Sequence, residues 1–291
     1  MKHPEPPKAY RNEKFLHSAA ARNIRVQCEL TEPRERFSEK NIRHTVVMFG
    51  SARLVDEERA IKGLKEAIAA FEKEDTAETR KALQMAKIRE RGAPYYEMAR
   101  EVARKLAEWS KELPKEKQFQ ICTGGGPGIM EAGNRGAYEA GKDSIALGIS
   151  LPFEQHINPY ASEACSFEFH YFFVRKFWFF YLAKALLAFP GGFGTMDELF
   201  EVLTLIQTRK YHKHVPVILV GRKFWEDIIN FDAFVEWGVI SEKDLSLFHI
   251  VDSADEAVRI LQEDFKKNFL KAPEQPISMH LLPDPDYPVE I

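Results

Sequence analysis

The sequence predicts an α/β protein with a Rossmann-like, doubly wound parallel sheet, helices on both faces and an N-terminal helical extension. Short apolar runs bounded by glycine or proline alternate along the chain with amphipathic segments of helical period. The apolar runs are continuous, as in parallel strands that are buried on both faces. Glycine-rich turns follow two of these runs, at the position where such folds bind their ligands.

Six apolar runs are predicted strands, at 45–50, 120–125, 144–150, 185–192, 215–221 and 247–252. Amphipathic helices are expected between them, near 94–111, 128–140, 172–184, 195–208, 222–236 and 253–267. The highly charged, helix-prone residues 72–92 indicate an exposed helical excursion and not a hinge. We therefore expect a helical extension over 1–43, a Rossmann-like domain over 44–270 and a C-terminal tail over 271–291.

The charge balance argues against a nucleic-acid partner. The 291 residues include 41 Lys and Arg against 44 Asp and Glu, a net charge of −3, whereas nucleic-acid binders need a basic surface that neutralises phosphates. The N-terminus has no apolar core that could serve as a secretory signal, so a cytoplasmic location is expected.

Aromatic residues are concentrated in one segment. Of the 22 Phe, 9 Tyr and 4 Trp, ten fall between Phe167 and Tyr181. A membrane span needs about 20 predominantly apolar residues, and this segment is interrupted by charged side chains such as Glu168, Arg175 and Lys176. It therefore predicts a buried segment, and no membrane partner.

Cysteine and histidine spacing gives no sign of a metal site. The three cysteines, Cys28, Cys122 and Cys165, lie far apart, and the nine histidines form no ligand motif. We expect reduced, mostly buried thiols, no metal and no cofactor.

The two glycine turns resemble each other. GGPGIMEA (125–132) and GGFGTMDE (191–198) both read G-G-x-G-x-M followed by an acidic residue at the start of a helix. Such turns let a ligand approach the backbone, and the helix N-terminus presents free N–H groups to an anion. A single turn of this kind could need glycine only for its backbone geometry. Two such turns in one sheet favour a binding site for a phosphorylated small molecule.

Known nucleotide motifs fit poorly. The dinucleotide fingerprint would need glycine where Ile129 or Glu131 stands, and the G-x-x-x-x-G-K pattern at 136–142 is followed by Asp143 in place of Ser or Thr. Gly141 is better interpreted as a helix C-cap.

The segment ALLAFPGGFGTMDELFEVLT, with FHYFFVRK upstream, carries the most specific pattern, P-G-G-x-G-T-x-x-E after an Arg-Lys pair. This pattern resembles the Lonely Guy (LOG) family, also labelled lysine decarboxylase-like. Its members are Rossmann-fold phosphoribohydrolases that cleave nucleoside 5′-monophosphates, including cytokinin riboside monophosphates. The resemblance extends from FGSAR (49–53) through TGGGPGIMEAGNRGA (123–137) to about Gly221. Phe172 and Val174 replace the Met and Glu of the family's M-x-E-R-K, a departure that bears on base preference.

The resemblance implies a role for each matching residue. Arg175 and Glu198 match the catalytic pair. The implied substrate- and phosphate-binding residues are Ser51, Arg53, Gly124, Gly125, Gly126, Glu131, Lys176, Gly191, Gly192, Gly194 and Thr195. The family also implies a homodimer or higher homo-oligomer with sites near the interface.

The chemistry of these residue types agrees with the implied reaction. Cleavage of an N-glycosidic bond passes through an oxocarbenium-like sugar, which a carboxylate such as Glu198 can stabilise while it helps to activate water. A permanently charged guanidinium such as that of Arg175 can hold phosphate or ribose oxygens, or orient the carboxylate. The expected reaction releases the free base and ribose 5-phosphate.

Simpler interpretations remain beside the catalytic one. Thr195 and Glu198 have the spacing of a capping box, and Arg175 could form an ordinary ion pair. Glu131 and Asn134 could contact a ligand or only cap and pack. Lys176 and Lys184 could be Schiff-base lysines, although no partner for a pyridinium nitrogen is evident. A noncatalytic nucleotide-binding or carrier protein on the same scaffold is the alternative function.

The aromatic segment is interpreted as the strand and helix that bring Arg175 and Lys176 to the crevice. Phe172, Phe179, Leu182 and Leu186 have the spacing of one buried helix face. The further aromatic residues Phe173, Phe177 and Trp178 are expected in part to line a base pocket or a subunit interface.

Overall fold

The structure is a computed structural model that describes residues 6–151, 156–211 and 213–271. Seven parallel strands form one sheet in the order β4-β3-β2-β1-β5-β6-β7. The strands are β1 Thr45–Phe49, β2 Gln120–Thr123, β3 Ile145–Ile149, β4 Ser166–Phe169, β5 Ala183–Ala188, β6 Val217–Val220 and β7 Phe248–Val251. The predicted doubly wound α/β fold is confirmed, and β4 is a seventh strand, formed by the start of the aromatic segment.

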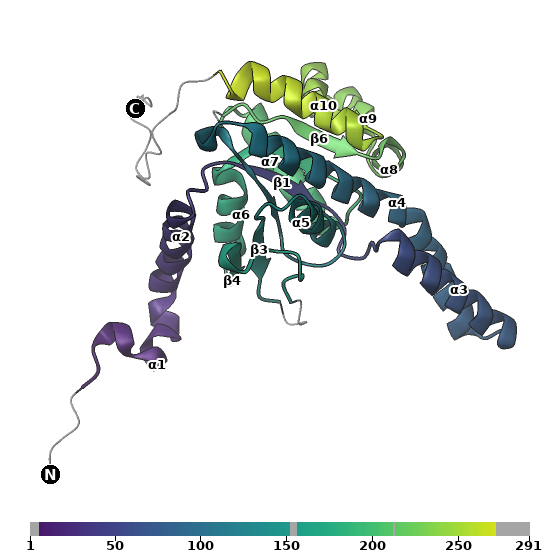
Figure 1. The fold of residues 1–291 in the computed structure, drawn as a ribbon, viewed down its shortest axis with the longest axis horizontal. Coiled ribbons are helices and arrows are strands. Elements are labelled where there is room, and N and C mark those ends of the chain that lie inside the picture. The colour runs from purple at the N-terminus through teal and green to yellow at the C-terminus, as the bar shows by residue number, and fades with distance from the viewer. Residues whose placement is uncertain (1–5, 152–155, 212, 272–291) are drawn as a thin grey trace, which may run out of the picture.

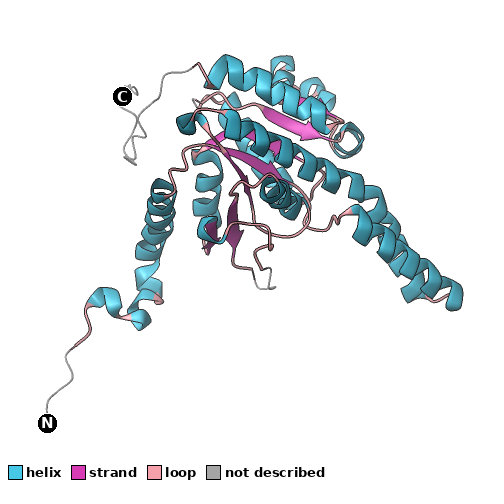
Figure 2. Ribbon diagram, in the orientation of Figure 1, coloured by secondary structure: helices cyan, strands magenta, loops and turns pink. Residues whose placement is uncertain are grey.

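Helices cover both faces of the sheet (Figures 1 and 2). Because side chains alternate along a strand, Val46 and Met48 of β1 pack on one face and Val47 and Phe49 on the other. The first face is covered by α4 (Ala77–Glu112), α5 (Ile129–Glu139) and α10 (Ala254–Asp264). The second is covered by α6 (Phe172–Tyr181), α7 (Phe193–Gln207), α8 (Arg222–Ile228) and the end of α2 (Arg22–Glu39). Two hydrophobic cores therefore flank the strands.

The charged residues 72–92 lie in a helical hairpin that projects from the body (Figure 1). Helix α3 (Glu57–Lys73) leads into α4, whose first turn is closed by a capping box between Thr76 and Thr79. The prediction that a helix begins near 94 was wrong, because α4 runs unbroken through Pro94. Packing of its second half on the sheet outweighs the helix-breaking tendency of a single proline.

Two other boundaries differ from the prediction. The helix expected over 172–184 ends at Tyr181, because Ala183 already pairs with Thr45 in the sheet. The helix expected over 222–236 is two helices, α8 and α9 (Phe231–Glu236), and the side chain of Asn230 caps the second.

The predicted buried face of the aromatic helix was only partly right. Phe179, Leu182 and Leu186 are buried as expected, but Phe172 is 53% exposed. Leu186 lies in β5 and not in a helix. The four-residue step from Leu182 to Leu186 was misleading because the helix ends at Tyr181.

The N-terminal extension contains the short helix α1 (Glu13–Leu16) and the longer α2, which packs against α6. Trp178 donates its indole N–H to the carbonyl of Glu29 at 3.0 Å, and its ring lies 5.3 Å from that of Phe37. The carboxylate of Glu29 accepts the backbone N–H groups of His170 and Tyr171. The end of β4 and the start of α6 are thus fixed by α2. The division into domains stays a prediction, and nearly all of the expected tail lies outside the described residues.

Within the described ranges, no helix has both the length and the hydropathy that a membrane span requires.

Candidate active site

The two glycine turns lie on either side of the loop that follows β1. They follow β2 and β5, which are not neighbours but flank the central strand β1. Backbone hydrogen bonds join the three loops: Ser51 N–H donates to the carbonyl of Pro190 at 2.9 Å, and Ile129 N–H donates to that of Ser51 at 3.1 Å. The chain order reverses at β1, so these loops lie at the topological switch point, where doubly wound sheets bind ligands.

The first turn needs glycine for conformation and for space. Gly125 and Gly128 have φ values of +74° and +71°, in the left-handed region. A Cβ on Gly128 would lie 2.2 Å from the carbonyl oxygen of Ser51, and one on Gly125 would lie 2.7 Å from Cδ1 of Ile157. The backbone of this turn is therefore packed between its neighbours and directed toward the N-terminus of α5.

The second turn begins α7. Gly192 is the N-cap, so Thr195 and Glu198 lie inside the helix and form no capping box. Thr195 instead packs on the turn, since a Cβ on Gly191 would lie 2.1 Å from its Oγ1. Gly192 and Gly194 have no neighbours that a Cβ would contact, which leaves space beside the unbonded N–H groups of the first helical turn.

Arg175 lies against the first turn. Its Nε donates to the carbonyl of Leu147 in β3 at 2.7 Å, and its guanidinium carbon lies 5.0 Å from the ring of Phe179. A Cβ on Gly124 would lie 2.5 Å from Nη2 of Arg175, so only glycine leaves room for the guanidinium there. Burial lowers the pKa of Arg175, and the negative charge of Glu198 opposes that shift.

Glu198 projects from the second turn of α7 and is only 6% exposed. Burial raises the pKa of its carboxyl group, the positive charge of Arg175 counteracts this, and the charge of Asp197 adds to the rise. Among the described residues no cation lies within ion-pair distance of this carboxylate. A desolvated carboxylate with a raised pKa, near a fixed arginine, is typical of an acid–base site.

The remaining predicted residues lie around this pair in different environments. Lys176 pairs with Asp197 and Glu201 of α7 at 2.7 Å each, and these partners raise its pKa against the effect of burial. Arg53 is exposed, and its backbone N–H donates to Oγ of Ser51 at 3.1 Å.

Glu131 is directed away from the first turn toward the helical hairpin. Its carboxylate accepts from the guanidinium of Arg59 in α3 and from the hydroxyl of Tyr96 in α4. The structure thus gives Glu131 a packing role, and its role toward a ligand stays a prediction.

A buried amide network behind the first turn was not predicted. Asn158 donates its side-chain N–H groups to the carbonyls of Gly125 and Gly126 at 3.0 and 3.2 Å, and to Oδ1 of Asn134 at 2.9 Å. Asn134 also accepts from Thr123 Oγ1 at 2.7 Å, and that hydroxyl accepts the N–H of Gly125 at 3.0 Å. The Asn-Pro pair at 158–159 signals a turn in the sequence, but nothing in it shows that the turn folds onto Gly125.

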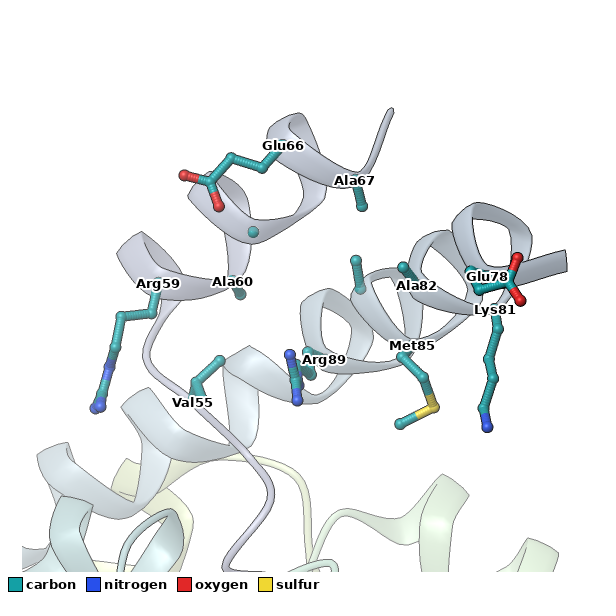
Figure 3. Close-up of a pocket in the computed structure, with 12 residues that line it drawn as sticks. Val55, Arg59, Ala60, Glu66, Ala67, Glu78, Lys81, Ala82, Met85 and Arg89 are labelled. Atoms are coloured by element: carbon teal, nitrogen blue, oxygen red, sulfur yellow. The ribbon is translucent and has the colours of Figure 1, made fainter. Parts of the chain in front are cut away.

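A cavity of about 720 Å³ lies elsewhere, between α3 and α4 (Figure 3). Small side chains such as Ala60, Ala67 and Ala82 line it, with charged groups at its rim. It contains none of the residues predicted for the site.

No cluster of three or more His, Cys, Asp or Glu side chains suited to a metal ion occurs in the described part of the chain. The three cysteines are free thiols, and Cys122 and Cys165 are buried.

Residues 130–261 match a family model described as "Possible lysine decarboxylase". The cytokinin riboside 5′-monophosphate phosphoribohydrolase LOG of Oryza sativa subsp. japonica is 28% identical over 176 residues, which cover 60% of this chain and 68% of that protein. The pyrimidine/purine nucleotide 5′-monophosphate nucleosidase of Escherichia coli (strain K12) is 30% identical over 160 residues, which cover 50% of this chain and 34% of that protein. The rice protein named probable phosphoribohydrolase LOG4 is 33% identical over 81 residues, 28% of this chain and 35% of that protein. The last two matches thus span about a third of the relatives' length.

Among solved structures, the Moco carrier protein from Chlamydomonas reinhardtii aligns with a TM-score of 0.44 at 19% identity, covering 77% of this chain and 99% of that one. The sequence matches confirm the resemblance to the LOG family that the P-G-G-x-G-T-x-x-E motif predicted.

Proposed function

From the confirmed resemblance of this chain to the LOG family, we propose that it hydrolyses the N-glycosidic bond of a nucleoside 5′-monophosphate. The substrate is AMP-like or a cytokinin riboside monophosphate, and the products are the free base and ribose 5-phosphate. One observation carries the proposal: Arg175 lies directly on the first glycine turn and interacts electrostatically with the buried Glu198 of the helix that the second turn begins.

The phosphate is held by the two glycine turns. Their helix N-termini direct unbonded N–H groups and a positive dipole end toward the crevice, which suits a dianion. The turns are joined through the loop of Ser51, so an anion bound there contacts segments from three strands at once. Thr195, Ser51 and Arg53 contribute hydroxyl and guanidinium donors at its edge.

Glu198 and Arg175 act at the ribose. Cleavage breaks the bond from C1′ to the base nitrogen, and the electron pair leaves with the base, which takes up a proton from solvent. Water then bonds to C1′ as Glu198 accepts its proton, while the carboxylate stabilises the oxocarbenium-like charge. The raised pKa of Glu198 makes this carboxylate a stronger base than an exposed one. Arg175 holds sugar or phosphate oxygens with fixed donors.

Self-association would complete the surroundings of the site. Phe172, Phe173 and Phe193 are 53%, 56% and 97% exposed, and all three lie in α6 or α7 close to Arg175 and Glu198. Exposed aromatic groups of this kind are typical of interfaces. We expect a homodimer through this face, whereas Trp178 is already covered by α2. The cytoplasmic location expected from the sequence stays a prediction.

A monophosphate panel tests the proposed reaction. Purified protein is incubated with purine, pyrimidine and cytokinin riboside monophosphates, and ribose 5-phosphate is measured. Glu198→Gln is expected to lose about 10²- to 10⁴-fold in rate, the usual contribution of a general acid or base. Glu139→Gln on α5, which pairs with Arg100 and Arg135, is the matched control and is expected to retain activity.

Cleavage of no monophosphate, or equal rates for Glu198→Gln and the wild type, would contradict the proposal. Tight binding of a monophosphate without cleavage would instead support the noncatalytic nucleotide-binding or carrier function.

A further inference from the structure

The edge of the sheet opposite the candidate site carries a group of basic side chains, named here the basic edge: His44 before β1, Lys184 in β5, Lys117 and Lys213. Burial, together with the charges of Lys213 and Lys117, lowers the pKa of Lys184 to about 8. Burial and the charges of Lys184, Lys117 and Lys213 lower the pKa of His44 to about 3. These groups are thus close enough to repel one another.

The described residues supply little compensation for this charge. No carboxylate of the described ranges lies within ion-pair distance of Lys184 or Lys213. The Nδ1 atom of His44 is buried without a hydrogen-bond partner among the described residues. An ammonium group such as that of Lys184 or Lys213 is costly in a partly buried site when no described carboxylate pairs with it, so an anionic partner is expected for these two lysines.

The last described residues lie at the basic edge. Phe269, in the π-helical turn Phe265–Phe269, has its ring 4.7 Å from that of His44. Nζ of Lys184 lies 5.3 Å from the same ring. The described part of the chain therefore ends close to His44 and Lys184.

The sequence of 272–291 complements the basic edge. It contains four acidic residues, Glu274, Asp284, Asp286 and Glu290, and no Lys or Arg. Five of its residues are proline, which favours an extended chain of about 3.1 Å per residue. A segment of this length can cross the whole edge of the sheet.

An apolar groove continues from the basic edge. A cavity of about 320 Å³ lies between α2 and α6, and its apolar lining is formed by Phe37, Ile42, Trp178, Tyr181 and Leu182. Arg34 and Arg43 also line its wall. Lys213 joins the groove to the basic edge, because its Nζ donates to the carbonyl of Tyr181 at 2.8 Å. The segment has apolar side chains to match, Leu281, Leu282 and Tyr287, next to its aspartates.

We propose that residues 272–291 of the same chain bind across this edge as a strap, with carboxylates at Lys184 and Lys213 and apolar side chains in the groove between α2 and α6. The strap neutralises the basic edge and covers apolar surface. It also fastens α2 to the sheet and to the end of α6, the helix that carries Arg175. This inference does not depend on the proposed reaction.

Zero-length cross-linking of the full chain tests the strap. A carbodiimide joins a carboxylate to an amine only when the two are in contact, and the lowered pKa leaves a substantial neutral fraction of Lys184 near pH 7.5. Peptide mapping is expected to find Asp284 or Asp286 joined to Lys184 or Lys213. Lys62 and Lys65, exposed on α3, are the controls and are expected to remain unjoined to the segment.

Three further measurements separate the alternatives. The cross-links are expected to fall several-fold in 1 M salt, which screens the attraction, and in an Asp284→Asn, Asp286→Asn double variant. A mixture of isotopically heavy and light chains shows whether each cross-link lies within one chain.

Cross-links confined to single chains support the strap. Hybrid heavy–light products would assign the segment to a second copy and overturn it. Equal cross-linking to Lys62 and Lys65, or no cross-link at the basic edge, would also overturn it.

Discussion

Asn158 offers a sharp test of how the first glycine turn is held. Its side-chain amide is buried and donates to the carbonyls of Gly125 and Gly126 and to Oδ1 of Asn134. Asn158→Ala removes these bonds together. The carbonyl of Gly125 keeps the backbone N–H of residue 158 at 2.8 Å, and Asn134 keeps Thr123. With two to three effective bonds lost at about 1 kcal/mol each, the free energy of unfolding is expected to fall by about 2–3 kcal/mol.

The isosteric change Asn158→Asp is expected to be more damaging than the truncation. A carboxylate would face three oxygen acceptors in place of a donor, and no cation is hydrogen-bonded to Asn158 among the described residues. A buried charge without a partner costs roughly 3–5 kcal/mol. The surrounding oxygens would raise the pKa of the introduced carboxyl group, so the folded state would take up a proton. The lost stability is therefore expected to return as the pH falls toward that raised pKa.

Urea unfolding at pH 7 and pH 5 measures the free energy of unfolding of both variants. Steady-state kinetics with a monophosphate shows how the displaced turn changes KM and kcat. We expect KM to rise more than kcat falls, because the displaced turn is the proposed phosphate site. Asn268→Ala, whose exposed side chain donates to Asp264 at 2.8 Å, is the control and should change stability by less than about 0.5 kcal/mol. Equal stability of the Asp and Ala variants at pH 7, or an unchanged KM, would refute the reasoning.

Three other outcomes are expected. The rate of cleavage should fall as the pH drops through the raised pKa of Glu198, because the reaction uses the ionised carboxylate; a pH–rate profile without an acid limb would contradict this. Gly125→Ala should lower the free energy of unfolding by about 2–4 kcal/mol, since the added Cβ meets Ile157 and strains a positive φ; denaturant titration measures it. Tyr96→Phe should cost about 1 kcal/mol through loss of the bond to Glu131, with no change in kcat; a large fall in kcat would argue for a direct catalytic role of that carboxylate.

Local patterns predicted much of this molecule. Continuous apolar runs identified six of the seven strands, because strands buried on both faces have few polar positions. The glycine pattern predicted a tight turn at 125–128. Gly125 and Gly128 do have a positive φ and a close backbone approach, and these exclude other residues. The motif that contains Gly191 and Glu198 also predicted its local structure, because its residues form one turn and the helix that follows.

Boundaries and burial were less predictable where tertiary contacts outweigh local preference. Pro94 lies within one long helix because packing on the sheet and on α5 stabilises both sides of it. Phe172 has the spacing of a buried position and shares a side of α6 with the buried Phe179, yet it is exposed at the first residue of the helix. Period alone does not show how far along a short aromatic helix the core extends.

The sequence by itself determined the fold class and the two glycine turns, and it singled out Arg175 and Glu198 as candidate site residues, a role that stays a prediction. Only the tertiary structure decided that β1 lies between the strands that carry the turns, and that Asn158 holds the first turn. It also showed that Glu131 faces α3 and α4 while Arg175 faces the turn. The physical reason is range: turns and periodicity depend on neighbouring residues, whereas strand order and buried hydrogen bonds join residues that are distant in the sequence.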